Sequence, residues 1–232
     1  MNKTKIEWCD ITLNPIVGCT YGCEYCYAKK LNDRFKWVKN WNEPQFFQER
    51  LRKLSTIRNP QNIFMNSMSD IADWGEKETK QIIRVMQMNN KHNYLFLTKR
   101  PSKFEYYRYL DMPNIWVGTT VTDNLDLGKI SSLVIKTLPY VKMHKFISFE
   151  PLHDNLKIYN HPIEDYNWII IGAETGNRKG KITPKKEWID DIVKIASEFK
   201  IPVFMKDSLI NIIGEEGMLR QFPKELKKED KQ

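Results

Sequence analysis

Gly18-Cys19-Thr20-Tyr21-Gly22-Cys23-Glu24-Tyr25-Cys26-Tyr27 is the stretch on which the interpretation of this chain depends. It holds three of the four cysteines of the chain, with the spacing C-x-x-x-C-x-x-C. Three thiolates this close together, on a loop that contains glycine, can converge on one centre of soft metal ions. They cannot complete a four-thiolate site among themselves, and the only other cysteine is Cys9. The question is therefore which metal centre accepts three cysteine ligands.

The composition is that of an ordinary globular protein, with 41% hydrophobic and 28% charged residues among 232. No run approaches the roughly 18 consecutive apolar residues of a membrane-spanning helix, and the first residues lack the apolar segment of a signal peptide. We expect a cytoplasmic protein that does not bind a membrane. In that compartment clustered cysteines indicate metal or redox chemistry more often than structural disulfides.

The formal net charge of +8 has two interpretations. It can serve solubility alone, or it can attract a polyanionic partner such as a nucleic acid or a nucleotide. Part of the charge lies in a tail of mixed sign that begins at about residue 224. The sequence leaves both interpretations open.

Short apolar runs alternate with helical patterns along most of the chain. Continuous apolar runs, in which no polar residue occupies every second position, are typical of parallel strands buried on both faces. The runs are 63–66, 94–97, 115–118, 145–149, 168–171 and 201–205, with a weak first strand at 15–17. Helical patterns cover 24–35, 46–54, 77–88, 102–110, 125–138 and 185–199.

This count falls short of the eight strand–helix units of a complete barrel. We predict an α/β fold, a partial (βα) barrel with about six to seven parallel strands, and keep a doubly wound sheet as the second choice. No linker or low-complexity tract interrupts the chain, so we expect a single domain over residues 1–232.

Polar residues follow each of these runs, at the end where a parallel strand finishes. Parallel α/β folds place binding sites at the carboxyl ends of their strands, so we expect these residues to meet at one edge. They are residues 18–26, 66–70, 98–100, 119–123, Glu150, 172–174 and Lys206.

Some of these residues have simpler interpretations as turn or capping residues, namely Ser69, Asp70, Thr122 and Asp123. Glu150 precedes a proline and Glu174 lies between small residues. Neither glutamate has an obvious capping role, and we assign both to the site.

Lys99, Arg100 and Lys206 are cations that come directly after predicted strands. Such cations either hold a ligand carboxylate or phosphate, or belong to solvated loops. The four histidines are scattered, and we assign no role to His92, His144, His153 and His161.

Three metal or thiol chemistries compete for the cysteines. Structural zinc needs four ligands, usually from paired C-x-x-C units, and only Cys23 and Cys26 form such a unit, although Cys9 could serve as a fourth ligand. A disulfide or a catalytic thiol leaves the third cysteine unexplained. A [4Fe-4S] cluster with one iron left open fits three thiolates better.

The chain resembles the radical S-adenosylmethionine (SAM) superfamily in three respects. These are the cysteine spacing, an aromatic residue (Tyr25) directly before the last cysteine, and the place of the cysteines after the first strand of a predicted partial barrel. Further segments resemble a branch of short radical-SAM-like proteins of phages and bacteria. These are Ile6-Glu7-Trp8, Asn14-Pro15, and residues 66–70, 97–101, 117–120, 148–152 and 172–176.

The resemblance implies a mechanism. Cys19, Cys23 and Cys26 would each bind one iron, and the amino and carboxylate groups of SAM would chelate the fourth. Reductive cleavage of SAM, with an electron donor such as flavodoxin or ferredoxin, would give a 5′-deoxyadenosyl radical that abstracts hydrogen from the substrate. The protein would orient the cofactors and exclude competing reactions.

The resemblance and the strand order also suggest contacts to SAM. Where many superfamily members have a Gly-Gly-Glu-like stretch for the amino group, this chain has Asn66-Ser67-Met68-Ser69, so backbone carbonyls and hydroxyls would serve instead. The remaining candidates are Thr98, Lys99 and Arg100 for the carboxylate, Thr119 and Glu150 for the ribose, and Gly172 and Ala173 for close approach to the adenine.

Three functions remain open at this point. The first is a radical enzyme acting on a nucleic-acid base, nucleotide or modified nucleoside, and the second is one acting on a peptide or protein. The third is a non-enzymatic, metal-stabilised nucleic-acid-binding domain. Aromatic residues near basic ones could stack on bases or cover the barrel, namely Trp37, Trp41, Phe46 and Phe47. Cys9 is interpreted as a buried small residue.

Overall fold

The computed structural model describes residues 4–227. Its main sheet has seven strands in the order β1-β4-β5-β6-β7-β8-β9, so that strand neighbours follow one another along the chain. The strands are β1 (Ile11–Thr12), β4 (Asn62–Phe64), β5 (Asn93–Thr98), β6 (Ile115–Thr120), β7 (His144–Phe149), β8 (Trp168–Ile171) and β9 (Val203–Met205).

Parallel pairing is observed for β1–β4, β4–β5, β7–β8 and β8–β9. Every residue of β6 and of β8 is buried, as expected for strands covered on both faces. The predicted α/β fold class, a partial (βα) barrel with six to seven strands, is confirmed.

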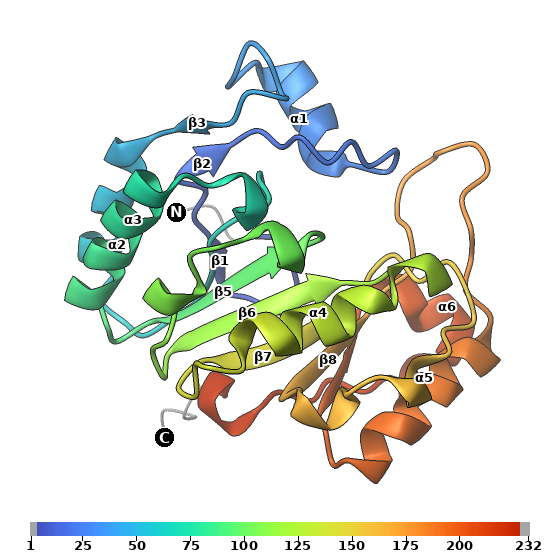
Figure 1. Ribbon diagram of the computed structural model, residues 1–232. Coiled ribbons are helices and arrows are strands. Elements are labelled where there is room, and N and C mark those ends of the chain that lie inside the picture. The colour runs from blue at the N-terminus through green and yellow to red at the C-terminus, as the bar shows by residue number, and fades with distance from the viewer. Residues whose placement is uncertain (1–3, 228–232) are drawn as a thin grey trace. The chain divides into compact units, whose positions relative to one another are not determined.

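The prediction for the first strand is wrong. Ile16–Val17 is β2, and it pairs antiparallel with β3 (Gln45–Phe46) in a separate two-stranded sheet. Figure 1 shows this pair close to α1. The first strand of the main sheet is instead the two-residue β1, which is too short to give a sequence pattern of its own.

The internal contacts divide the chain into two compact units. The first comprises residues 1–117 and 136–143, and the second comprises residues 118–135 and 144–232. The prediction of a single domain stays a prediction. The helices are α1 (Tyr27–Phe35), α2 (Arg52–Thr56), α3 (Glu76–Met88), α4 (Gly128–Thr137), α5 (Lys186–Glu198) and α6 (Ile210–Ile213).

Two helical predictions need correction. Residues 102–110 form no α-helix but two 3₁₀ turns, Pro101–Lys103 and Tyr107–Tyr109. Phe104 and Tyr107 are buried with their rings in edge contact at 4.8 Å, so aromatic packing decides this segment. Residues 46–54 divide into the end of β3, a 3₁₀ turn (Gln48–Leu51) and the start of α2.

The predicted solvated tail is also only partly correct. Lys224–Leu226 is a 3₁₀ turn whose Leu226 side chain is buried, so the chain is still packed there. Residues 228–232 of the predicted tail lie outside the described residues. Between residues 4 and 227, no helix combines the length and the apolar character needed to cross a membrane.

Each unit packs its longest helix through one apolar face. In the first unit, α3 buries Ile82, Ile83 and Met86. In the second unit, α5 buries Ile189, Ile192 and Ala196. The spacing of three and four residues is that of a helix with one side on a core.

Gly118 tests the packing of the second unit. A Cβ at Gly118 would lie 2.6 Å from the ring of the buried Phe146. We expect Gly118→Ala to lower the free energy of unfolding by about 1–3 kcal/mol, as overpacked cores do. Urea denaturation followed by circular dichroism measures the change.

Gly128→Ala is the matched control. A Cβ at this first residue of α4 meets no atom of the described residues within 4 Å, so we expect a change between zero and a gain of about 1 kcal/mol. Equal destabilisation by both substitutions would contradict the packing described for Gly118.

Candidate functional site

The three clustered cysteines lie on the loop that leads into α1. Their side chains are half-buried, and none of them forms a disulfide within the described part of the chain. The Cys19 sulfur accepts a hydrogen bond from the backbone amide of Tyr21 at 3.4 Å. Cys26 caps α1, and its sulfur accepts from the amide of Lys29 at 3.3 Å. Amide donors at a helix N-terminus favour negative charge, which suits a thiolate.

The entry of this loop requires a glycine. Gly18 has φ +115°, and a Cβ there would lie 2.8 Å from the Pro44 Cα and 2.9 Å from the Trp41 carbonyl oxygen. The next amide, that of Cys19, donates to the same Trp41 carbonyl at 2.8 Å. The backbone of the cysteine loop is therefore in close contact with the segment before β3.

An apolar cluster lies under the loop. Buried side chains of Val17, Ala28, Val38, Trp41 and Met68 form it, and Cys19 and Cys26 pack against it. Trp41 is a buried member of this cluster and is not available to stack on a base. Trp37, in contrast, is exposed.

Burial raises the pKa of the thiols of Cys19 and Cys23. It raises the pKa of Cys19 to about 12, against the opposing effect of the Tyr21 amide. Burial also raises the pKa of Cys23, with Lys99 acting in the opposite direction. Thiolates are the metal-binding form, so a metal that bound Cys19 and Cys23 would displace their protons.

The donor set distinguishes between a single ion and a cluster. Among residues 4–227, no three His, Cys, Asp or Glu side chains are arranged to hold one metal ion. A zinc site needs its ligands within about 2.3 Å of one ion. In an iron–sulfur cluster the thiolates bind different irons and need not converge on one point. Three thiolates suit a cluster with one open iron, whereas structural zinc is almost always four-coordinate.

Cys9 precedes the cysteine loop in the chain. Its thiol donates to the Ile6 carbonyl at 3.7 Å, and the side chain is half-buried, not buried as predicted.

The ends of β4 and β5 are joined by two buried polar side chains. Asn66 donates to the Leu97 carbonyl at 2.6 Å and accepts from the Leu97 amide at 3.0 Å. Asp70 accepts from Thr98 Oγ1 at 2.6 Å and from the Lys99 amide at 2.9 Å, while it also caps the turn that follows it. Asn66 and Thr98 thus have structural bonds at the positions predicted to contact SAM.

The two serines of this stretch are also bonded within the protein. Ser67 Oγ donates to the Asn14 side chain at 3.1 Å, and the Ser67 carbonyl accepts from Tyr27 Oη at 2.9 Å. Ser69 Oγ accepts from Trp74 Nε1 at 3.0 Å.

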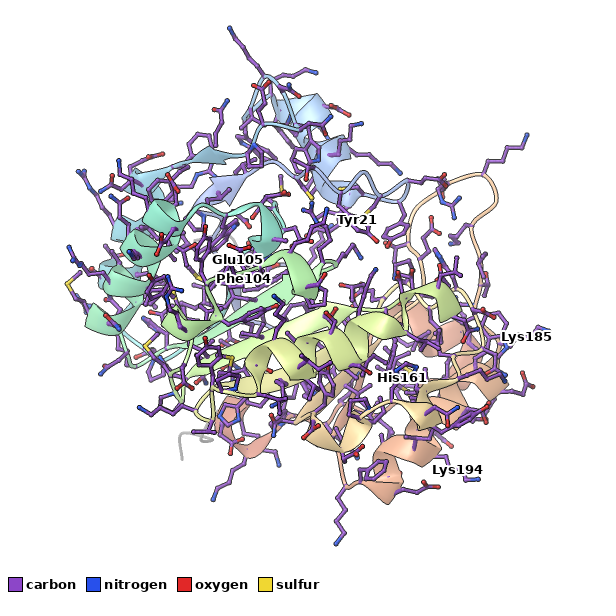
Figure 2. All side chains as sticks on the ribbon, in the orientation of Figure 1. Tyr21, Phe104, Glu105, His161, Lys185 and Lys194 are labelled. Atoms are coloured by element: carbon purple, nitrogen blue, oxygen red, sulfur yellow. The ribbon has the colours of Figure 1, made fainter. Side chains whose placement is uncertain are left out.

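Lys99 and Arg100 face the aromatic residues of the cysteine loop. The Lys99 ammonium lies 5.2 Å from the centre of the Tyr25 ring, and the Arg100 guanidinium lies 5.7 Å from that of Tyr21. Figure 2 labels Tyr21 on the loop before α1. The two cations are therefore not merely solvated residues of a βα loop.

Thr20 and Asp73, which the sequence patterns do not single out, join this arrangement. Asp73 accepts from the Thr20 amide at 2.9 Å and from Thr20 Oγ1 at 2.7 Å. Arg100 donates to Thr20 Oγ1 at 2.8 Å and to Asp73 at 2.7 Å. Burial tends to raise the pKa of Asp73, but the bonds from Thr20 and Arg100 outweigh it and lower that pKa.

In the second unit, the residues predicted to contact SAM lie in two groups. Glu150 is paired with Lys206, and a Cβ at Gly172 would lie within 3.2 Å of both side chains. Ala173 donates its amide to Ser208 Oγ at 3.0 Å. Thr119 is buried in β6.

Glu174 is the centre of the other group. It accepts from Arg178 through both carboxylate oxygens, at 2.7 and 2.8 Å, and lies 3.1 Å from His153 Nε2. The side chain of Glu174 is only 3% exposed. The bond from Arg178 lowers its pKa, with His153 acting in the same direction. The assignment of no role to His153 therefore overlooks this contact, which no sequence spacing indicates.

The chain matches, over residues 3–213, the family described as protein of unknown function (DUF5131), and it belongs to that family. A 103-residue segment is 32% identical to the uncharacterized protein MJ0683 of Methanocaldococcus jannaschii. That match covers 43% of this chain and 39% of the relative.

Among solved structures, the chain is similar to spore photoproduct lyase. One such structure is a double mutant of the lyase with bound AdoMet and dinucleoside spore photoproduct, with a TM-score of 0.56 at 10% identity. Another is the lyase complexed with dinucleoside spore photoproduct, with a TM-score of 0.55 at the same identity. Each comparison covers 88% of this chain and 78% of the other. At 10% identity, the similarity establishes the fold alone.

The buried carboxylate of Glu174 should make the free energy of unfolding depend on pH. Because its folded pKa lies below the ordinary 4.5, Glu174 stabilises the fold above that pH and loses the contribution as the pH falls through the folded value. We expect Glu174→Gln to cost about 1.5–3 kcal/mol at pH 7, as for bonds to a charged group. The difference from wild type should shrink below pH 4.5.

Urea denaturation between pH 7 and pH 3 measures this difference. Glu164→Gln is the control, because Glu164 is exposed. A difference for Glu174→Gln that stays constant over the whole range would contradict the assignment.

Proposed function

We propose that this chain is a radical SAM enzyme in which Cys19, Cys23 and Cys26 hold a [4Fe-4S] cluster. The observation that carries the proposal is the cysteine loop itself. It offers three thiols, two of them with amide donors to their sulfurs and two packed on an apolar cluster. The fold around it is similar to that of a structure with bound AdoMet.

The residues of the chain bind and shield the centre. The amides of Tyr21 and Lys29 donate to two of the cysteine sulfurs and so compensate negative charge on thiolates. The apolar cluster below excludes water from one side. When bound, the cluster supplies the electron for reductive cleavage of SAM.

Lys99 is the strongest candidate for the SAM carboxylate in the first unit. The Lys99 ammonium lies over Tyr25 beside the last cysteine, so its positive charge is placed next to the cysteine loop. The carbonyls of residues 66–69 are candidates for the amino group, because an oxygen that accepts one hydrogen bond keeps a second lone pair. Thr119, Glu150, Gly172, Ala173 and Glu174 stay predictions for the rest of SAM.

For the substrate we propose a nucleic-acid base or a nucleotide. The fold neighbours hold a dinucleoside photoproduct, and the net charge of +8 suits a phosphate-bearing partner. No structural feature described above favours a peptide substrate or a non-enzymatic domain. An electron donor such as flavodoxin or ferredoxin, a cytoplasmic location and a place in the short phage and bacterial branch also stay predictions.

The cysteines provide the test. After anaerobic reconstitution with iron and sulfide and reduction with dithionite, the wild-type protein should convert SAM to 5′-deoxyadenosine, detected by mass spectrometry. Cys19→Ala, Cys23→Ala and Cys26→Ala should each abolish this product, because each removes one cluster ligand. Iron and sulfide analysis should show the loss of the cluster in the same variants.

Cys9→Ala is the matched control and should keep both the cluster and the product, because the Cys9 thiol bonds to the Ile6 carbonyl outside the loop. One equivalent of zinc in the purified protein, together with no SAM cleavage after reconstitution, would refute the proposal.

A further inference from the structure

Thr20 is the residue between Cys19 and Tyr21, and two of its polar groups are bonded to one carboxylate. Its amide and its hydroxyl donate to the two different oxygens of Asp73, at 2.9 and 2.7 Å. Asp73 lies 53 residues further along the chain, at the end of a short turn after β4. A two-point contact of this kind fixes the orientation of Thr20 as well as its position.

Arg100 completes the arrangement from the end of β5. One of its terminal nitrogens donates to Thr20 Oγ1 at 2.8 Å and the other donates to Asp73 at 2.7 Å. Its Nε is buried, has no hydrogen-bond partner among residues 4–227 and lies 4.0 Å from Asp70. We name Thr20, Asp73 and Arg100 the loop clamp.

The loop clamp differs from an ordinary surface ion pair. The Arg100 and Asp73 side chains are 14% and 10% exposed, whereas Arg108 and Glu76 elsewhere in the same unit are 53% and 41% exposed. Exposed pairs contribute little to stability, while shielded, multiply bonded ones contribute more. Asp73 is also not needed to cap its own turn, because Asp70 already caps it.

We propose that Arg100 and Asp73 are positioning residues that hold the cysteine loop, through Thr20, in the conformation that binds the cluster. The part of this inference that concerns the cluster rests on the proposed function. The part that concerns the loop does not, because the contacts join residues of the chain alone. The Arg100 guanidinium has a second effect. Its bond to Thr20 places a positive charge beside the residue that follows Cys19, and such a charge favours addition of an electron to a bound cluster.

Amide hydrogen exchange of the protein, purified without metal, tests the loop. We expect Asp73→Ala, which removes the acceptor of the Thr20 amide, to accelerate exchange at that amide by about tenfold to a hundredfold, the effect of losing a hydrogen bond to a charged group. Arg100→Ala leaves that bond in place but removes the group that holds Asp73 and the Thr20 hydroxyl together, so we expect a smaller acceleration in the same direction. Arg108→Ala, with its exposed pair to Glu76, is the matched control and should leave the Thr20 amide unchanged.

Thr20→Val is the second variant, in case Asp73→Ala does not fold. It removes the hydroxyl that bonds to both partners but keeps the backbone amide and the shape of the side chain. Unchanged exchange across residues 19–23 in a folded Thr20→Val or Arg100→Ala protein would overturn the loop clamp.

Two readouts on the reconstituted protein test the consequence for the cluster. Arg100→Ala should lower the iron content per chain and shift the midpoint potential of the remaining cluster to a more negative value. Arg100→Lys keeps the charge but not the forked contact, so it should restore the potential without restoring slow exchange at Thr20.

The two proposals can fail separately. If the wild-type protein assembles no cluster, the proposed function fails while the exchange experiment still decides the loop clamp. If the wild type assembles a cluster, and if Arg100→Ala has wild-type iron content and potential, the role in positioning is refuted and the proposed function stands.

Discussion

The cysteine loop depends on a backbone contact that only glycine permits. Gly18 lies so close to Trp41 and Pro44 that any side chain would overlap backbone atoms. This contact sets Cys19 on the apolar cluster, and at the other end of the loop Cys26 begins α1 as its cap. The three sulfurs are therefore presented by one short segment, fixed at both of its ends.

The polar residues after β4 and β5 complete the support from the other side. Asp70 accepts hydrogen bonds from the end of β5. Asp73 and Arg100, which follow the same two strands, are hydrogen-bonded to each other and to Thr20. The same short segments thus stabilise the sheet edge and hold the cysteine loop. Several residues predicted to contact SAM, such as Asn66 and Thr98, prove to hold this support together.

The sequence predicts the parts whose signal is local. β8 and α5 have continuous apolar or periodic patterns, and the prediction matches both within a residue at each end. The cysteine spacing is also a local signal, and the cluster that it suggests stays a prediction. By contrast, β1 is too short to leave a pattern. Residues 102–110 have the apolar spacing of a helix, but the packing of Phe104 on Tyr107 is accompanied by 3₁₀ turns instead. The loop clamp joins residues 53 and 80 positions apart, which no local pattern can reveal.

If the three cysteines hold a [4Fe-4S] cluster, one of its irons is left open for SAM. Electron paramagnetic resonance of the reduced, reconstituted protein, recorded with and without SAM, tests it most directly. We expect a [4Fe-4S]⁺ signal whose g-values change when SAM is added, because SAM would bind the open iron. A cluster signal that is identical with and without saturating SAM would contradict it.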